Sequence, residues 1–355
     1  MKLEGRDTAA LLAAAELARL KSGARLRPIV ALEGGEAYAT NGDVAMRYQL
    51  EAPPELPGPV RLGAEHFAAV LGLGGGVTLE ASDTQATLEG EGARYTLPLL
   101  TEEPPQLERA AELTTGFVSV PVSVLSRLER LTSYAASSER TRYAMNGMRL
   151  ELSGSGLRAV ATDGKRLAVV DHAMAVPDLA YGAGVVPVRA LQHALKMAKL
   201  LEAHALELRI TSRVMSFSGA GFELTARLVE GSYPPYAQVI PEKPGHTATV
   251  ERRALQAALG RAVVVLTREY RTLRMKWCGR CLTLSANAAD VGSSSATVDI
   301  DYGGPTLEIG INPAYIGEAL KALEAEAVSV ELRSPGEALV IRADGLLYVV
   351  MPVNL

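Results

Sequence analysis

The sequence predicts an α+β fold with antiparallel sheets, built from three repeated units near residues 1–115, 116–243 and 244–355. Three observations support this prediction. A short turn segment recurs at nearly constant spacing along the chain, and a pair of apolar residues in predicted helices recurs at the same spacing. The order helix, strands, helix, strands also begins again in each unit.

The recurring turn segment is clearest at residues 161–170, ATDGKRLAVV. Short β-rich runs flank Asp163 and Gly164, the residues that reach positive φ at low cost, so we predict two strands joined by a tight turn. A similar segment, AYATNGDVAM, lies 122 positions earlier, with Asn41 in the place of Asp163. A looser one, LTLSANAADV, lies 124 positions later, with Asn287 in that place.

The second helix of each predicted unit fixes the register independently. Its apolar pairs, four residues apart, are Phe67 with Leu71, Leu191 with Leu195, and Ile316 with Leu320. Successive pairs are 124 and 125 positions apart, which matches the spacing of the turns. Two unrelated features therefore give one period.

Helix-forming runs between start and stop signals predict six helices. The first begins after Asp7, an N-cap candidate. The predicted ranges are 7–20, 64–73, 121–133, 188–201, 252–266 and 313–323. Alternating apolar and polar residues predict strands between them, and EEPPQL at 102–107 reads as a linker.

Composition sets limits on the class of protein. Of 355 residues, 48% are hydrophobic and 21% are charged, as in globular proteins. The net charge of −4 excludes a general attraction to nucleic acid or to an anionic membrane, so such binding needs a local basic patch. Without an apolar signal or membrane-spanning run, and with two cysteines, we expect a cytoplasmic protein.

Two short motifs have competing interpretations. Cys278 and Cys281 have the spacing of zinc or redox sites, but no second pair completes a zinc site, and a hairpin turn at Gly279 is the favoured interpretation. The run LGLGGGV at 71–77 follows a helix rather than preceding one, which favours a helix stop over a phosphate-binding loop.

Catalytic patterns are missing from the sequence. The five histidines have no ligand spacing, and no nucleophile or zinc-protease motif occurs. Asp163, Lys165 and Arg166 are compatible with catalysis, but turn residues explain them equally well. We therefore expect no catalytic residue, no metal and no cofactor.

Positive charge is concentrated on predicted helices. Arg189, His193, Lys196 and Lys199 share one helical face, whereas acidic residues such as Glu80 lie in strand-rich segments. This pattern indicates either a nucleic-acid surface or a solvated helix face.

Six segments in order resemble one family: RYAMNGMRLEL, ATDGKRLAVVD, VPVRAL, LVEGSYPPY, EIGINPAY and YVVMPVNL. Together they resemble the β subunit of bacterial DNA polymerase III, the sliding clamp. This resemblance implies three clamp domains per chain and a homodimeric ring, with helices lining the hole and antiparallel sheets outside. It also implies a non-catalytic processivity factor that slides on double-stranded DNA without reading its sequence.

The resemblance assigns residues to three surfaces. DNA contacts fall on Arg25, Arg142 and Tyr143, to which the basic helix adds Arg189, Lys196 and Lys199. A peptide cleft for the polymerase III α subunit, other polymerases, the clamp loader, and mismatch-repair and ligase-type binders falls on Met145, Thr162, Gly164, Lys165, Arg166, Leu167, Pro234, Val239, Tyr270, Asn312, Tyr315, Met351, Pro352 and Val353. The dimer interface falls on Val265 and Leu266, facing the strand at 93–99.

Some positions depart from the family pattern. His66 lies where a basic pair is common, Gln238 where a base is frequent, and Asn354 where an arginine is usual. These departures leave open a diverged paralogue that binds polymerase peptides without encircling DNA. A third hypothesis is a nucleic-acid enzyme that uses Asp163 and Lys165.

Overall fold

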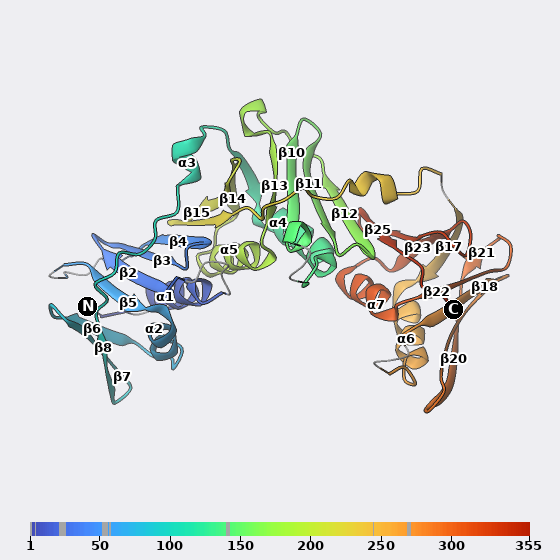
Figure 1. The fold of residues 1–355 in the computed structure, drawn as a ribbon, viewed down its shortest axis with the longest axis horizontal. Helices are drawn as coiled ribbons and strands as arrows, with labels where there is room; N and C mark the ends of the chain where they lie inside the picture. Colours follow the sequence, from blue (N-terminus) through green and yellow to red (C-terminus); the bar gives the residue numbers. More distant parts are fainter. Residues whose placement is uncertain are drawn as a thin grey trace. The chain divides into compact units, whose positions relative to one another are not determined.

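The computed structural model describes residues 2–3, 5–20, 26–51, 56, 58–139, 143–243, 245–267 and 271–355 (Figure 1). It divides into two compact units. Unit 1 comprises Met1–Arg127, Leu150–Leu157 and Met174–Val229, and unit 2 comprises Leu128–Arg149, Arg158–Ala173 and Glu230–Leu355.

The first run of elements matches the predicted order. It contains β1 (Lys2–Leu3), α1 (Gly5–Ala18), β2 (Ile29–Glu33), β3 (Glu36–Thr40), β4 (Val44–Gln49), β5 (Val60–Gly63), α2 (Ala64–Leu71), β6 (Val77–Ala81), β7 (Gln85–Gly90) and β8 (Ala93–Pro98). Helix α2 ends before the glycine run, where Gly74 has a φ of +88°. The predicted helix stop is confirmed.

Asp7 does not cap α1, contrary to prediction. It lies inside the helix and is 5% exposed. Its carboxylate accepts hydrogen bonds from the hydroxyl of Tyr48 (2.8 Å) and the N–H of Glu51 (3.1 Å). The Asp7 carboxylate therefore makes tertiary hydrogen bonds instead of the helix cap that the local pattern predicted. Burial and the hydrogen bond to Asp7 raise the pKa of Tyr48.

The second run follows the linker. It contains α3 (Ala110–Leu113), β9 (Val118–Pro121), α4 (Val122–Thr132), η1 (Ser133–Ala135), η2 (Tyr143–Met145), β10 (Met148–Ser153), β11 (Gly156–Thr162), β12 (Arg166–His172), η3 (Asp178–Ala180), β13 (Gly182–Val186), α5 (Val188–Leu200), β14 (Ala205–Ile210), β15 (Val214–Gly219), β16 (Phe222–Arg227) and η4 (Tyr236–Val239). The predicted hairpin is confirmed, since residues 163–165 join β11 to β12.

The third run completes the chain. It contains β17 (His246–Glu251), α6 (Arg252–Ala262), β18 (Leu273–Cys278), β19 (Cys281–Ala288), β20 (Gly292–Asp299), β21 (Asp301–Tyr302), β22 (Leu307–Ile311), α7 (Pro313–Ala322), β23 (Ala327–Leu332), β24 (Leu339–Ala343) and β25 (Leu346–Val350). Helix α6 is shorter than predicted because three β-branched valines, which favour helix poorly, follow Ala262.

The third turn was predicted at the wrong residues. Asn287 lies within β19, opposite Ser293 of β20, and the turn is at residues 289–291. The repeated element order is nevertheless kept, because β19 and β20 are each eight residues long and the hairpin turns later.

Each unit contains antiparallel sheets covered by helices, which confirms the α+β prediction. Unit 1 has the orders β1-β6-β7-β8 and β5-β2-β3-β4-β16-β15-β14-β9. Unit 2 contains the consecutive strands β11-β12-β25-β24-β23-β17-β21 of a nine-stranded sheet, and the complete sheet β20-β19-β18-β22. Strands β8 and β20 are sheet edges in the described structure.

The helices bury the residues that set the predicted register. Phe67, Leu191 and Ile316 are at most 1% exposed, and Leu195 is half-buried. Helix α1 packs against α2 and α5 within unit 1 (Figure 1). Its buried residues are mostly alanines, whose small side chains allow close packing of helices and sheet.

Candidate functional site

The turn between β11 and β12 is held by its own side chains. The hydroxyl of Thr162 donates to the carbonyl oxygen of Arg166 (2.6 Å) and accepts from the N–H of Gly164 (3.1 Å). Oδ1 of Asp163 accepts from the N–H groups of Lys165 (2.9 Å) and Arg166 (3.0 Å). Gly164 has a φ of +84°, whereas Asp163 is not at positive φ and contributes to the turn through its side-chain hydrogen bonds.

An identical pattern holds the turn between β3 and β4. Thr40 replaces Thr162, bonding the carbonyl of Val44 and the N–H of Gly42. Oδ1 of Asn41 replaces that of Asp163, accepting from the N–H groups of Asp43 and Val44. The two turns therefore share their hydrogen bonds and differ in the residues after the glycine.

Arg166 is the buried cation of this region, with its side chain 9% exposed. It donates to Oδ2 of Asp163 (3.1 Å), to the carboxylate of Glu318 on α7, and to the carbonyl of Tyr134 (2.6 Å). Its guanidinium lies 4.5 Å from the ring centroid of Tyr315. One side chain thus connects the start of β12 to α7 and η1.

Aromatic groups complete the buried layer beneath the turn. The rings of Tyr134 and Tyr348 lie 5.6 Å apart, and the Tyr348 hydroxyl donates to the carbonyl of Tyr315 (3.1 Å). Burial raises the pKa of both Tyr134 and Tyr348. Burial alone would lower the pKa of Arg166, but Tyr348 and Glu318 outweigh it, so this arginine stays charged.

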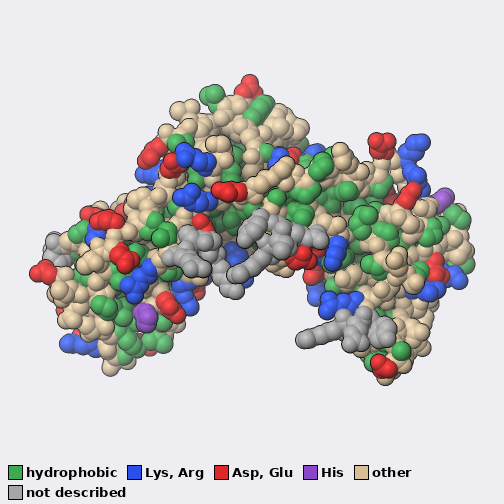
Figure 2. All heavy atoms as spheres, in the orientation of Figure 1, with side chains coloured by type: hydrophobic (Ala, Val, Ile, Leu, Met, Phe, Trp, Pro, Cys, Tyr) green, Lys and Arg blue, Asp and Glu red, His purple; other side chains and the backbone are tan. Residues whose placement is uncertain are grey.

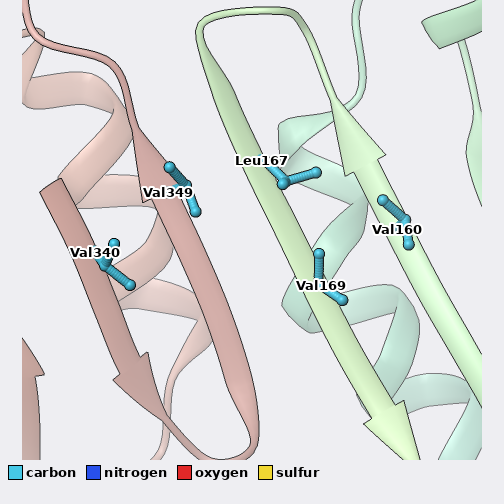
Figure 3. Close-up of a cluster of buried hydrophobic side chains, with 5 residues drawn as sticks. All are labelled: Val160, Leu167, Val169, Val340 and Val349. Atoms are coloured by element: carbon cyan, nitrogen blue, oxygen red, sulfur yellow. The ribbon is translucent and has the colours of Figure 1, made fainter. Parts of the chain in front are cut away.

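An apolar stripe lies on the sheet face opposite the helices (Figure 3). Its buried members are Val160, Leu167, Val169, Val340 and Val349, and Tyr233, Tyr236 and Ile240 pack against them. The strand register brings these side chains into one row across the sheet. Leu167 of β12 is opposite Val349 of β25, and Val349 is in turn opposite Val340 of β24. Of this stripe only Leu167 was predicted. Strand alternation in YVVMP would have indicated Val349.

The chain end is attached to the same turn. The N–H of Met351 donates to the carbonyl of Lys165 (2.9 Å), and that of Val353 donates to Gly310 on β22 (2.9 Å). The side chains of Met351 and Val353 remain 42% and 37% exposed, and Pro352 between them is half-buried. The segment therefore offers apolar side chains from a fixed backbone.

The remaining predicted cleft residues lie on several segments of unit 2. Pro234 is half-buried and Val239, in η4, is 47% exposed. Asn312 caps α7 by accepting from the N–H of Ala314 (3.1 Å), one turn before Tyr315. Met145 is half-buried, and its carbonyl accepts from Ser137 (3.0 Å). Tyr270 lies outside the described residues.

The cations predicted for DNA occupy helix α5 of unit 1. Arg189, Lys196 and Lys199 are all exposed, and Lys196 pairs with Glu16 of α1. Burial lowers the pKa of His193 on the same helix, so it adds no charge near neutral pH. Arg25, Arg142 and the side chain of Tyr143 lie outside the described part. Basic and acidic side chains are interspersed on the face drawn in Figure 2.

Val265 and Leu266, predicted for the dimer interface, follow the end of α6. Both are half-buried, while the adjacent Val264, which the sequence did not single out, is 75% exposed. Leu266 also lines a groove of about 850 Å³ formed largely by α6 and the first turns of α7.

Within the described residues, no group of His, Cys, Asp and Glu could hold a metal ion. The CxxC is a hairpin, because Cys278 and Cys281 are opposed ends of β18 and β19. The helices described are all too short or too polar to cross a bilayer.

The repeated antiparallel α+β runs define a protein of the DNA-clamp class. Models of the DNA polymerase III beta subunit match its central domain at residues 119–235 and its C-terminal domain at 237–354. The Synechococcus elongatus beta sliding clamp is 32% identical over 290 residues, covering 79% of this chain and 76% of that protein. The Pseudomonas putida clamp is 27% identical over 341 residues, covering 92% and 91%.

Solved structures give the same fold. The DNA polymerase III beta subunit of Thermotoga maritima matches with a TM-score of 0.88 at 20% identity, over 100% of this chain and 99% of that one. That of Pseudomonas aeruginosa matches with a TM-score of 0.85 at 24% identity, over 100% of both chains. The chain belongs to the beta sliding clamp family, the DNA polymerase III beta subunits.

Family membership makes the chain a non-catalytic polymerase subunit, which excludes the enzyme hypothesis. The geometry agrees, since the carboxylate of Asp163 is engaged by Lys165 and Arg166 within its own turn.

Proposed function

We propose that the chain is a processivity clamp that acts in the bacterial cytoplasm as a homodimeric ring around duplex DNA. Three domains, at residues 1–115, 116–243 and 244–355, would form half of the ring. The repeated element order supports these boundaries. The exposed cations of α5, with Arg25, Arg142 and Tyr143, would contact phosphates without reading bases.

The peptide cleft is proposed around the turn at Thr162–Leu167 and the segment Met351–Val353. The observation that carries this proposal is the hydrogen bond from Met351 N–H to Lys165 O, which holds exposed apolar side chains beside the stripe of Leu167. An apolar surface on a fixed backbone, bordered by polar groups, is suited to binding the apolar side chains of a short peptide. Polymerases, the clamp loader, mismatch-repair proteins and ligases are the proposed partners.

The test of the cleft uses two separate variants, Met351→Ala and a chain truncated after Val350. Binding of a peptide from the polymerase α subunit should be lost, while light scattering should still give about 75 kDa, twice the chain mass of 37.5 kDa. Peptide binding that survives both changes would remove the cleft assignment. A monomer at micromolar concentration would count against the ring.

For the interface we propose that Val265 and Leu266, with the exposed Val264, face the edge strand β8 of a second copy. Both β8 and β20 offer unpaired backbone groups at sheet edges, which suits strand pairing between chains.

One observation favours the alternative of a paralogue that does not encircle DNA. Lys196 is paired with Glu16, and burial lowers the pKa of His193, so α5 presents less unpaired positive charge than its sequence indicates. Stimulation of a polymerase that depends on the clamp loader separates the two, since only an encircling clamp gives it.

A further inference from the structure

The cysteine pair of unit 2 sits at the end of a hairpin. Cys278 ends β18, Cys281 begins β19, and the two are direct cross-strand partners. Gly279, with a φ of +58°, and Arg280 form the turn between them. Both cysteines are free thiols; Cys278 is exposed and Cys281 is half-buried.

The register places the two cysteines at a backbone separation that a disulfide can span. Directly opposed residues of antiparallel strands have Cα atoms about 4.5–5.5 Å apart. Disulfides span Cα separations of about 4.4–6.8 Å, a range that includes the separation of directly opposed residues. Opposed side chains also lie on the same sheet face.

That face is the solvent face of the sheet. The next cross-strand pair, Trp277 and Leu282, is buried at 2% and 0% exposure. Because successive side chains alternate between faces, the cysteines point away from the core. A small reagent can therefore reach Cys278 without opening the fold.

The surroundings favour chemistry of the two thiols alone. Thr306 Oγ1 donates to Sγ of Cys278 (3.4 Å), and Asp299 of β20 lies opposite Cys281 on its other side. The described residues add no third metal ligand to the pair. The exposed side chains of Lys276 and Arg280 flank the pair, and the acidic Asp299 and Glu308 lie opposite Cys281 and Lys276, so charges of both signs surround the thiols.

We propose that Cys278 and Cys281 form a dithiol modification site that reacts with a low-molecular-weight disulfide such as glutathione disulfide. The thiolate of Cys278 attacks one sulfur, forming a mixed disulfide and releasing one glutathione thiolate, which takes up the proton that Cys278 lost. The thiolate of Cys281 then attacks Sγ of Cys278, forming the Cys278–Cys281 bond and releasing the second glutathione. Two protein thiols are oxidised and one disulfide is reduced to two thiols.

This site is independent of the proposed clamp function. The loop that it closes is very short, so the cross-link constrains the unfolded chain little. Its expected effect is to protect exposed thiols from irreversible oxidation rather than to stabilise the fold.

The experiment incubates the reduced full-length protein with excess glutathione disulfide, alkylates the remaining thiols and measures intact mass. The wild type should lose the mass of two hydrogen atoms and take up no alkylating reagent. Cys278→Ser and Cys281→Ser are the matched controls, because the single remaining cysteine has no second thiol with which to form the intramolecular disulfide. Cys278→Ala and Cys281→Ala repeat the comparison if a serine variant fails to fold.

Each single variant should instead retain glutathione or a free thiol. A wild type that keeps bound glutathione on both cysteines, forms cross-linked dimers, or still alkylates at both positions would overturn the proposal. Reduction with dithiothreitol should restore both alkylated thiols.

Discussion

The guanidinium of Arg166 stacks at 4.5 Å on the ring of Tyr315 while its N–H groups bond the carboxylates of Asp163 and Glu318. This relationship joins the turn at Thr162–Arg166 to α7. Because only 9% of its side chain is exposed, Arg166 supports the turn from beneath and would position the wall of the proposed cleft.

Arg166→Ala should destabilise unit 2 by about 1.5–3 kcal/mol, because it removes hydrogen bonds between a buried guanidinium and the partly buried carboxylates of Asp163 and Glu318. Urea unfolding followed by circular dichroism measures the loss. Arg158→Ala is the control, since its pair with Asp171 is 43% and 62% exposed and should be worth about 0–1 kcal/mol. Equal losses in the two variants would refute the role given to Arg166.

Thr162→Ala and Thr40→Ala form a matched pair in two turns with the same hydrogen bonds. Each should cost about 1–3 kcal/mol, because buried backbone groups lose a partner. Only Thr162→Ala should also weaken binding of a polymerase-derived peptide, measured by calorimetry. The same loss of binding in Thr40→Ala would show that the cleft is not at this turn.

Gly310→Ala should loosen the chain end. A Cβ at this position would lie 2.6 Å from the carbonyl oxygen of Val353, whereas one at Gly303 would meet nothing within 4 Å. Loss of the Val353 hydrogen bond, about 0.5–1.5 kcal/mol, predicts roughly two- to tenfold weaker peptide binding. Faster hydrogen exchange at the Val353 amide would accompany it. Gly303→Ala should change neither, and unchanged exchange in Gly310→Ala would contradict the attachment.

Alkaline pH should destabilise unit 2. Burial raises the pKa of Tyr134 and Tyr348 above the unfolded value of about 10. Above that pH the unfolded chain loses phenolic protons that the folded chain keeps, so the free energy of unfolding falls as pH rises. Urea titrations at about pH 9 and about pH 11 measure the slope, and Tyr348→Phe should reduce it. An equal slope in the variant would contradict the assignment to Tyr348.

Local chemistry explains why much of this structure could be predicted. Gly164 and Gly279 mark their turns because few residues tolerate positive φ, and Phe67 and Ile316 mark helix faces because their spacing matches the core. The same logic failed where tertiary contacts decided the outcome. Asp7 accepts a hydrogen bond from Tyr48 instead of capping its helix. Asn287 is paired within the β19–β20 ladder, so the turn lies after it rather than at it.

The sequence indicated only part of the proposed cleft. Local pattern identified the turn at Asp163 but assigned it no partner, and by itself would have treated Met351–Leu355 as a frayed end. The resemblance to the clamp family assigned both to one predicted site, which stays a prediction. Neither the local pattern nor the resemblance indicated Val160 and Val340. Their packing with Leu167 depends on strand pairing between segments that are distant in the sequence.

Retention on DNA is the most direct test of a ring. The protein should be loaded by a clamp loader onto nicked circular DNA, isolated by gel filtration, and measured before and after the circle is cut by a restriction enzyme. An encircling clamp is retained on the circle and slides off the linear product, so the bound fraction should fall to background on cutting. Retention that is the same on circular and linear DNA would contradict the ring.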